Sequence, residues 1–125
     1  MAGVTMDAGG LIALERNDRR VLVLLARARE TRSRVTIPAT ALAQAIRQPE
    51  RQTRLARLVR QPTTDTVALD RVDATNVGRL LAASATTDIA DAHVVICARR
   101  TRQRVVTSDP EDLRALDPTT RLVVV

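Results

Sequence analysis

The sequence has no phenylalanine, tyrosine or tryptophan, no lysine, and a single cysteine. RNA-binding modules that stack bases on aromatic side chains need the rings that this chain lacks, which argues against that class of protein. Cys97 cannot form an internal disulfide, and it stands in the apolar segment VVICA. We therefore expect it to be a small buried hydrophobic residue rather than a reactive thiol.

The sequence also lacks a long apolar run. No stretch approaches the roughly 18 uninterrupted apolar residues of a membrane span, and the N-terminus does not show a basic region followed by an apolar run and a cleavage site. The predicted location is cytoplasmic, with no membrane partner. With 125 residues, 45% of them hydrophobic, the chain can bury one core. We expect a single domain over residues 1–125.

Positive charge is abundant, and all of it comes from arginine. The net charge is +6 and the pI is about 11.4. The planar guanidinium group fits phosphate bidentately, so an anionic polymer is a natural partner. Arg47 ends one predicted helix, and Arg51 and Arg54 lie in the next; these three residues are candidate RNA contacts. An arginine-rich surface that serves only solvation is an equally good interpretation of this pattern.

Apolar runs alternate with helical patterns along the chain. The pattern predicts strands at 3–7, 35–37, 66–69, 105–106 and 122–125, and helices through 11–14, 21–28, 41–47, 49–59, 72–81 and 89–97, with a short helix beginning at Pro110. Thr86 and Thr87 offer an N-cap for the helix through 89–97. Strands that alternate with helices are typical of an α/β fold with an open parallel sheet, here of four to five strands with helices on both faces.

Four aspartates fall where such a sheet would bring them together. Asp7 ends the first strand and Asp109 follows the strand at 105–106, while Asp88 and Asp91 lie three residues apart at the start of the intervening helix. Ligands of open parallel sheets bind beyond the carboxyl ends of the strands. Each aspartate considered singly could instead cap a helix or interact with its dipole.

Four carboxylates in one place would repel one another and raise one another's pKa values unless a cation were present. Mg²⁺ takes carboxylate oxygens and keeps several waters, one of which can become a nucleophile. Mn²⁺ is a possible substitute. The pattern therefore favours metal-dependent hydrolysis of a phosphodiester, with Asp7, Asp88, Asp91 and Asp109 as the candidate catalytic and metal-binding residues.

Three segments carry a resemblance to a known family. VTMDAGGLIAL at 4–14, TTDIADAHVV at 86–95 and VVTSDPEDL at 105–113 resemble, in this order and spacing, the aspartate motifs of PIN domains. The resemblance covers nearly the whole chain, and the size and basicity suit the VapC type of toxin ribonuclease. It implies that Asp7, Asp91 and Asp109 bind metal and that the Thr107 hydroxyl steadies the site. It further implies an RNA substrate, a VapB-like antitoxin and a homodimer.

One position departs from the family. PIN domains usually carry a glutamate on the helix after the segment at 35–38, where this chain has Gln44. An amide offers a carbonyl oxygen to a metal but no negative charge. Asp88, which lies outside the basic family pattern, could restore four carboxylates. We expect His93 to point away from the metal face in a surface or half-buried structural role, and Asp112 to serve the first turn of the last helix.

Two rival functions differ in class from a ribonuclease toxin. The first is a catalytically weakened PIN fold that acts as an RNA- or protein-binding module. Gln44, in place of the usual glutamate, is the residue that supports this alternative. The second is a phosphoacceptor domain, whose sheet also holds Mg²⁺ between acidic strand ends. That second function requires an acidic pair after the first strand and a lysine after the last, and the absence of lysine disfavours it.

Overall fold

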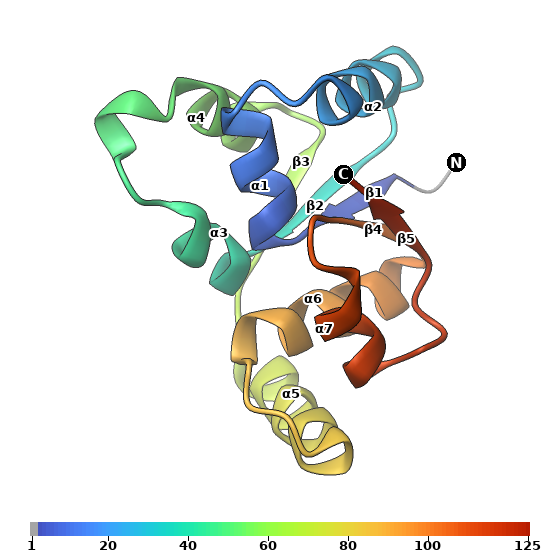
Figure 1. Cartoon of the computed structure of the whole chain (residues 1–125). Helices are drawn as coiled ribbons and strands as arrows, with labels where there is room; N and C mark the ends of the chain where they lie inside the picture. The colour runs from blue at the N-terminus through green and yellow to red at the C-terminus, as the bar shows by residue number, and fades with distance from the viewer. Residues whose placement is uncertain (1–2) are drawn as a thin grey trace.

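The computed structural model describes residues 3–125 (Figure 1). In chain order its elements are β1 (Val4–Met6), α1 (Ala8–Glu15), α2 (Arg19–Glu30), β2 (Val35–Pro38), α3 (Ala39–Ala45), the 3₁₀ helix η1 (Pro49–Arg51), α4 (Thr53–Arg60), β3 (Thr64–Val67), α5 (Arg71–Ser84), α6 (Ile89–Thr101), β4 (Arg104–Thr107), α7 (Pro110–Leu116) and β5 (Leu122–Val124). The alternation of strands and helices expected from the sequence is confirmed.

The five strands form one sheet in the order β3-β2-β1-β4-β5, and every neighbouring pair is parallel. In Figure 1, α1, α2 and α4 lie on one face of the sheet, and α5, α6 and α7 lie on the other. Because all strands run the same way, β1 and β4 end at the same edge, where Met6 pairs with Val106. The helices that follow these strands therefore begin side by side.

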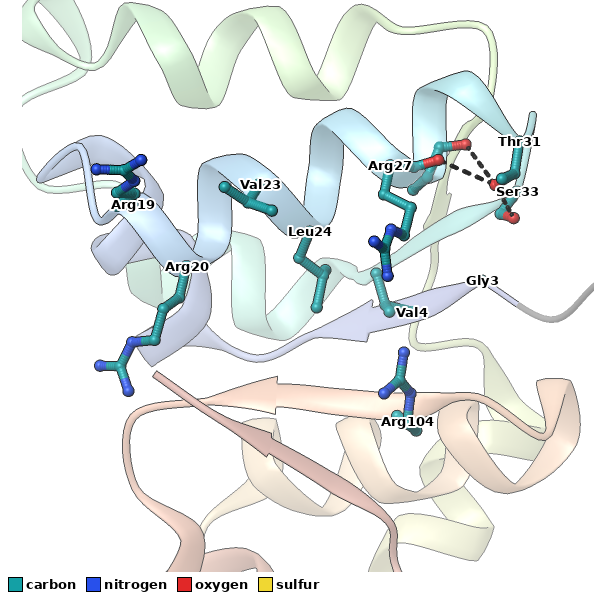
Figure 2. Close-up of a pocket in the computed structure, with 11 residues that line it drawn as sticks. Gly3, Val4, Arg19, Arg20, Val23, Leu24, Arg27, Thr31, Ser33 and Arg104 are labelled. Carbon is teal, nitrogen blue, oxygen red and sulfur yellow. Dashed lines mark hydrogen bonds between the residues drawn. The ribbon is translucent and has the colours of Figure 1, made fainter.

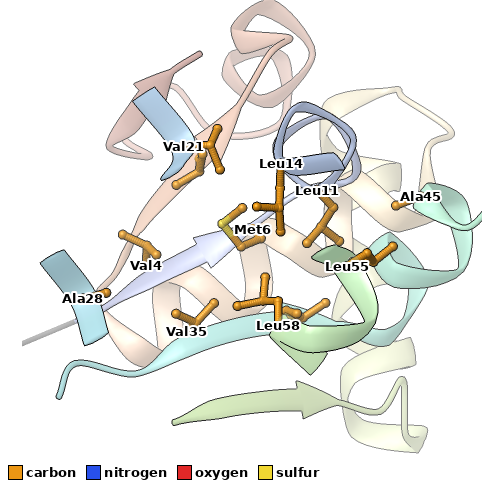
Figure 3. Packing of buried hydrophobic residues seen from close by; sticks show 12 residues of the cluster. Val4, Met6, Leu11, Leu14, Val21, Ala28, Val35, Ala45, Leu55 and Leu58 are labelled. Atoms are coloured by element: carbon orange, nitrogen blue, oxygen red, sulfur yellow. The ribbon is translucent and has the colours of Figure 1, made fainter. Parts of the chain in front are cut away.

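Each face of the sheet has its own apolar core. On the α1 side, Met6, Leu11 and Ile37 are fully buried in a cluster that also includes Leu55 and Leu58 from α4 (Figure 3). On the α6 side, a second cluster is built from valine, alanine and leucine. Short aliphatic side chains thus fill both layers without any aromatic ring, as expected for a chain with 45% hydrophobic residues. Cys97 is buried, as predicted.

The start of α1 lies unusually close to β4. A Cβ atom at Gly10 would stand 2.6 Å from the carbonyl oxygen of Val106, which no side chain could occupy without moving the backbone. A Cβ at Gly9 would meet the Ser108 hydroxyl at 2.2 Å. The glycine pair after Asp7 therefore lets α1 begin directly against the strand that leads to Asp109.

Three expected boundaries were wrong. β3 begins two residues earlier than the predicted strand at 66–69, because its mixed burial pattern gives no clear alternation. The helix predicted from Pro49 is broken into η1 and α4, because the Gln52 side chain bonds the backbone of Arg47, Gln48 and Ala45 in the bend between them. The expected threonine cap of α6 is also wrong, since Asp88 is the N-cap.

The apolar face predicted for α5 is partly wrong. The sequence pattern outlines this helix by Val72, Val77, Leu80 and Leu81. The Val72 side chain is nevertheless 61% exposed, whereas the neighbouring Asp73 is buried. The reason is an ion pair with Arg100 of α6 that holds the Asp73 carboxylate inside the protein. Within residues 3–125, no single helix is long and apolar enough to cross a membrane, and α5 with α6 meets that test of length and composition only as a pair bent by 110°.

Candidate active site

Asp7 follows β1 and begins α1. Its Oδ1 atom accepts a hydrogen bond from the backbone N–H of Gly10 at 2.7 Å, so the side chain caps the helix, and the residue is only 4% exposed. Burial raises the pKa of this carboxyl. Hydrogen bonds from Thr107 and Gly10 act in the opposite direction, and repulsion from Asp109 adds to the rise. Asp7 is thus a buried acid whose charge is only partly compensated.

Thr107 and Asp109 stand at the end of β4. Thr107 is fully buried, and its Oγ1 atom accepts a hydrogen bond from the backbone N–H of Asp109 at 2.9 Å. Asp109 is the N-cap residue of α7, yet its side chain makes no capping hydrogen bond. The capping role considered for Asp109 is therefore wrong. Its charge acts on the neighbouring acids instead, since Asp109 raises the pKa of both Asp7 and Asp112.

Asp88 and Asp91 supply the α6 part of the site. Asp88 Oδ1 accepts a hydrogen bond from the backbone N–H of Asp91 at 2.9 Å, so one oxygen of Asp88 caps the helix. The pKa of Asp91 is raised to about 7, first by burial and then by the charges of Asp88, Asp7, Asp112 and Asp109. Carboxylates from the starts of α1, α6 and α7 therefore gather close enough to repel one another strongly.

Asp112 is the acid that sequence reasoning missed. It was assigned to the first turn of α7 alone, but its pKa is raised by a hydrogen bond with Asp109 and by the charges of Asp109 and Asp88. The three-residue spacing from Asp109 to Asp112 places the two on one side of the helix start and was the signal that could have identified it. We call the set Asp7, Asp88, Asp91, Asp109 and Asp112 the aspartate cluster.

No arginine neutralises the aspartate cluster within the part of the chain that the structure describes. Among the described residues, its members form none of the ion pairs, although the chain carries 20 arginines. Four other aspartates do have an arginine partner: Asp18, Asp65, Asp73 and Asp117. A concentration of like charge with no internal partner is costly to the fold, and perturbed carboxyl groups of this kind cluster at functional sites.

Gln44 lies beside the cluster. It is exposed on α3 and lines, with Thr40, Thr87 and Asp88, an open hollow of about 410 Å³. The side chain that replaces the family's glutamate thus shares a surface with the aspartate proposed to compensate for it. The candidate RNA contacts follow along the chain and are all exposed: Arg47 after α3, Arg51 in η1 and Arg54 in α4.

His93 does not face the aspartate cluster. It is fully buried, with Nδ1 lying 2.8 Å from the Thr40 hydroxyl and Nε2 lying 3.5 Å from Asp73 Oδ2. The expected orientation away from the metal face agrees with these contacts, whereas the expected surface or half-buried position is wrong.

The donor set of the aspartate cluster fits a hard divalent cation. Every side-chain donor is a carboxylate oxygen, which suits Mg²⁺ or Mn²⁺ far better than a soft metal. Within residues 3–125, the aspartates do not form a trio of ligand atoms lying within 4.8 Å of one another. This looser spacing suits Mg²⁺, which usually keeps several waters and needs few direct protein ligands.

The comparisons with known proteins address the fold. No family model matches the sequence, and no curated protein matches it. Solved structures do match over almost the whole chain. The FitAB complex bound to an IR36 DNA fragment aligns with a TM-score of 0.67 and 13% identity over 97% of this chain and 94% of that chain.

Two further structures agree. VapBC2 from Rickettsia felis, bound to a DNA fragment from their promoter, aligns with a TM-score of 0.66 and 10% identity over 98% of each chain. PAE2754 from Pyrobaculum aerophilum aligns with a TM-score of 0.62 and 16% identity over 97% of this chain and 83% of that chain. At such low identity the likeness shows the fold alone, and the chain has a PIN-like α/β fold.

Proposed function

We propose that this protein is a Mg²⁺-dependent endoribonuclease toxin of the VapC type, able to use Mn²⁺, that hydrolyses phosphodiester bonds in RNA. The observation that carries the proposal is the aspartate cluster, which gathers five acids at the carboxyl edge of a PIN-like sheet without pairing any of them with an arginine. Such a cluster is explained by a cation that binds there.

The chain's own residues have distinct roles in this proposal. Asp7, Asp91 and Asp109 would hold the cation, with Asp88 as the fourth carboxylate. Mg²⁺ supplies, when bound, Lewis acidity toward the phosphodiester and an attacking water. Thr107 holds Asp7 and the Asp109 backbone in place through its buried hydroxyl. Burial and the neighbouring acids raise the pKa of Asp91 to about 7 in the metal-free protein, and a bound cation would lower this pKa and favour the carboxylate form that binds metal.

We place the RNA strand across α3, η1 and α4. Arg47, Arg51 and Arg54 are exposed there, and they follow Gln44, which shares a hollow with Asp88. Guanidinium groups bind phosphates of any sequence and make binding depend on salt. Replacing all three by glutamine should weaken RNA binding and flatten its salt dependence, with little change in the metal affinity measured by calorimetry.

We place a VapB-like antitoxin in the groove between α2 and the sheet. This groove, of about 550 Å³, has an apolar floor that includes Val4 and Leu24 (Figure 2). Its rim carries four arginines: Arg19, Arg20, Arg27 and Arg104. An antitoxin segment with apolar and acidic side chains complements such a groove. Charge reversal at Arg27 and Arg104 should weaken neutralisation of the toxin by the antitoxin.

A homodimer is also proposed, and its mass in solution can be measured by analytical ultracentrifugation.

A second function is favoured by one observation. Gln44 brings no negative charge to the hollow that it shares with Asp88. A catalytically weakened PIN fold that binds RNA or protein would tolerate this glutamine and would still use the arginines and the groove. Binding of RNA with no metal-dependent cleavage would favour this alternative.

The first experiment is a cleavage assay on total cellular RNA with Mg²⁺ or Mn²⁺ and a matched EDTA control. We expect fragments that require the metal and that disappear in Asp7→Ala. Fragments that persist in Asp7→Ala would indicate a contaminating nuclease and would remove the support for this function.

The second experiment tests whether Asp88 compensates for Gln44. Asparagine is also a good N-cap, so Asp88→Asn keeps the start of α6 and removes one charge. Activity should fall severely, and Gln44→Glu should tighten Mg²⁺ binding and partly rescue Asp88→Asn in a double-mutant cycle. Asp112 belongs to the aspartate cluster and is not a neutral control. Glu111→Gln on the same helix is the better control, because Glu111 is exposed and pairs with Arg114. Full activity in Asp88→Asn would refute the compensation.

A further inference from the structure

A second group of potential metal ligands lies on the other side of α6. Asp73 of α5 and His93 and Cys97 of α6 are all buried, and they offer ligand atoms that lie within 4.8 Å of one another. We call these three residues the Asp73 cluster. It shares no residue with the aspartate cluster and stands outside the proposed ribonuclease function.

His93 is the residue that points to a ligand. The side chain is fully buried, and its Nε2 atom forms no hydrogen bond of acceptable geometry, although Asp73 Oδ2 lies 3.5 Å from it. The Nδ1 atom is already occupied, since it lies 2.8 Å from the Thr40 hydroxyl. If Nδ1 donates to Thr40, Nε2 presents a lone pair toward Asp73, whose Oδ2 lies 3.5 Å away. An unpartnered nitrogen in a buried position is unfavourable, and metal coordination would satisfy it.

The arrangement of the three donors follows from the helices. His93 and Cys97 are four residues apart, so they project from the same side of α6. Asp73 reaches them from the first turn of α5, the helix that packs against α6. Imidazole nitrogen, thiolate sulfur and carboxylate oxygen are the donor types that zinc takes in proteins. The mixed set is unlike the all-oxygen aspartate cluster and selects a softer metal.

The positive charge of Arg100 already lies against the Asp73 cluster. Both carboxylate oxygens of Asp73 accept hydrogen bonds from Arg100, at 2.8 and 2.9 Å, and an Arg100 nitrogen lies 3.8 Å from Cys97 Sγ. The Arg100 side chain is 50% exposed, so it stands between the cluster and solvent. Burial meanwhile raises the pKa of the Cys97 thiol to about 11, which keeps the thiol protonated when no metal is bound.

We propose that Asp73, His93 and Cys97 form a zinc site that joins α5 to α6. Zn²⁺ would bind His93 Nε2, the Cys97 thiolate and one Asp73 oxygen, with the other oxygen still paired to Arg100. The Cys97 S–H bond breaks as the sulfur–zinc bond forms, and its proton leaves to solvent past Arg100. Zn²⁺, one thiolate and one carboxylate sum to zero charge, and Asp70, the N-cap of α5, is a further negative charge that acts on His93. A water fills the fourth position.

Cobalt titration of the full chain tests this site directly. Co²⁺ bound to a thiolate absorbs in the near ultraviolet, and this chain, which has no aromatic side chain, gives almost no background there. We expect one equivalent of Co²⁺ to produce the thiolate band and Zn²⁺ to abolish it by displacement. Cys97→Ser, a substitution of similar size, should lose the band, whereas Asp91→Asn should retain it.

Thermal unfolding of Arg100→Met supplies a second, independent measurement. Removing Arg100 leaves Asp73 without its cation, so the metal-free variant should unfold at a lower temperature than the wild type. Zn²⁺ should then raise its unfolding temperature by more than it raises that of the wild type, because the metal replaces the lost charge. Absence of a thiolate band at saturating Co²⁺ in both the wild type and Arg100→Met, with native circular dichroism, would overturn the proposal. So would an equal Zn²⁺ effect in Cys97→Ser.

Discussion

Helix α6 contributes to two acidic regions that treat their carboxylates in opposite ways. Near its start, Asp91 is surrounded by other acids, and its pKa is raised to about 7. On its other side, Asp73 of α5 pairs with Arg100, and this hydrogen-bonded pair lowers the pKa of Asp73. Both aspartates are removed from water to a large degree. The difference therefore arises from the neighbouring charges rather than from burial alone.

This difference separates acids that stabilise the folded state from acids that destabilise it. A paired acid such as Asp73 lowers the free energy of the folded state relative to an unpaired one, whereas like charges in the aspartate cluster raise it. A chain with 20 arginines could have paired either region. That only one is paired supports a functional role for the other.

The largest expected effect is on catalysis. Asp91→Asn should reduce metal-dependent RNA cleavage by about 100-fold or more, since an amide removes the charge at the centre of the cluster. Asp65→Asn is the matched control, because Asp65 is an exposed partner of Arg34 in the sheet. Initial cleavage rates on a labelled RNA measure both. Equal activity of the two variants would contradict the proposal that the unpaired acids are catalytic and the paired ones are not.

The next effect is on stability. Asp73→Asn should lower the free energy of unfolding by about 2 kcal/mol, which is less than for a fully buried pair because half of the Arg100 side chain reaches water. Asp65→Asn should cost less than about 1 kcal/mol, as an exposed pair does. Urea unfolding followed by far-ultraviolet circular dichroism, in EDTA, gives both values. A larger loss in Asp65→Asn would contradict the assignment.

Much of this arrangement was predictable from the sequence. Asp7, Asp91 and Asp109 were expected to lie together because strand ends and a helix start are visible in the pattern of apolar residues, and their effects on one another's pKa agree with this expectation. Asp112 was missed because first-turn acids are common in helices, so its role depends on the spatial position of Asp109. Local pattern identifies where an acid is in the chain but does not identify its neighbours.

The Asp73 region was hidden for a related reason. Val72 was interpreted as one of the apolar residues of α5, and no pattern in the sequence indicated that Asp73 is buried. Only the approach of Arg100, 27 residues later in the chain, makes burial of Asp73 favourable. The break between η1 and α4 has the same kind of cause, since it depends on side-chain hydrogen bonds of Gln52 that no periodicity reveals.

A third prediction compares the pH dependence of the two regions in the metal-free protein. The folded pKa of Asp91, about 7, exceeds its ordinary value of 3.8, so its contribution to stability is lost as pH rises from 3.8 to about 7. The folded pKa of Asp73 is lowered, so its contribution is present above 3.8 and is lost as pH falls further. Unfolding free energies measured from pH 3 upward should therefore decline less toward neutrality in Asp91→Asn than in the wild type. An unchanged slope would argue against strong repulsion in the cluster.

The smallest expected effect concerns glycine, and it sharpens the contrast between the two regions. Gly78 lies in the middle of α5, the helix that carries Asp73, and a Cβ added there would meet no atom within 4 Å. Gly78→Ala should therefore raise the free energy of unfolding by about 0.5–1 kcal/mol, because alanine loses less backbone entropy in a helix. Gly10, beside the aspartate cluster, has no such freedom, since its Cβ would stand 2.6 Å from the Val106 carbonyl oxygen. Gly10→Ala should destabilise the protein and displace the start of α1, which positions Asp7. Thermal unfolding of the two variants distinguishes them by sign, and a gain of stability in Gly10→Ala would mean that the close approach of α1 to β4 is not required to form the cluster.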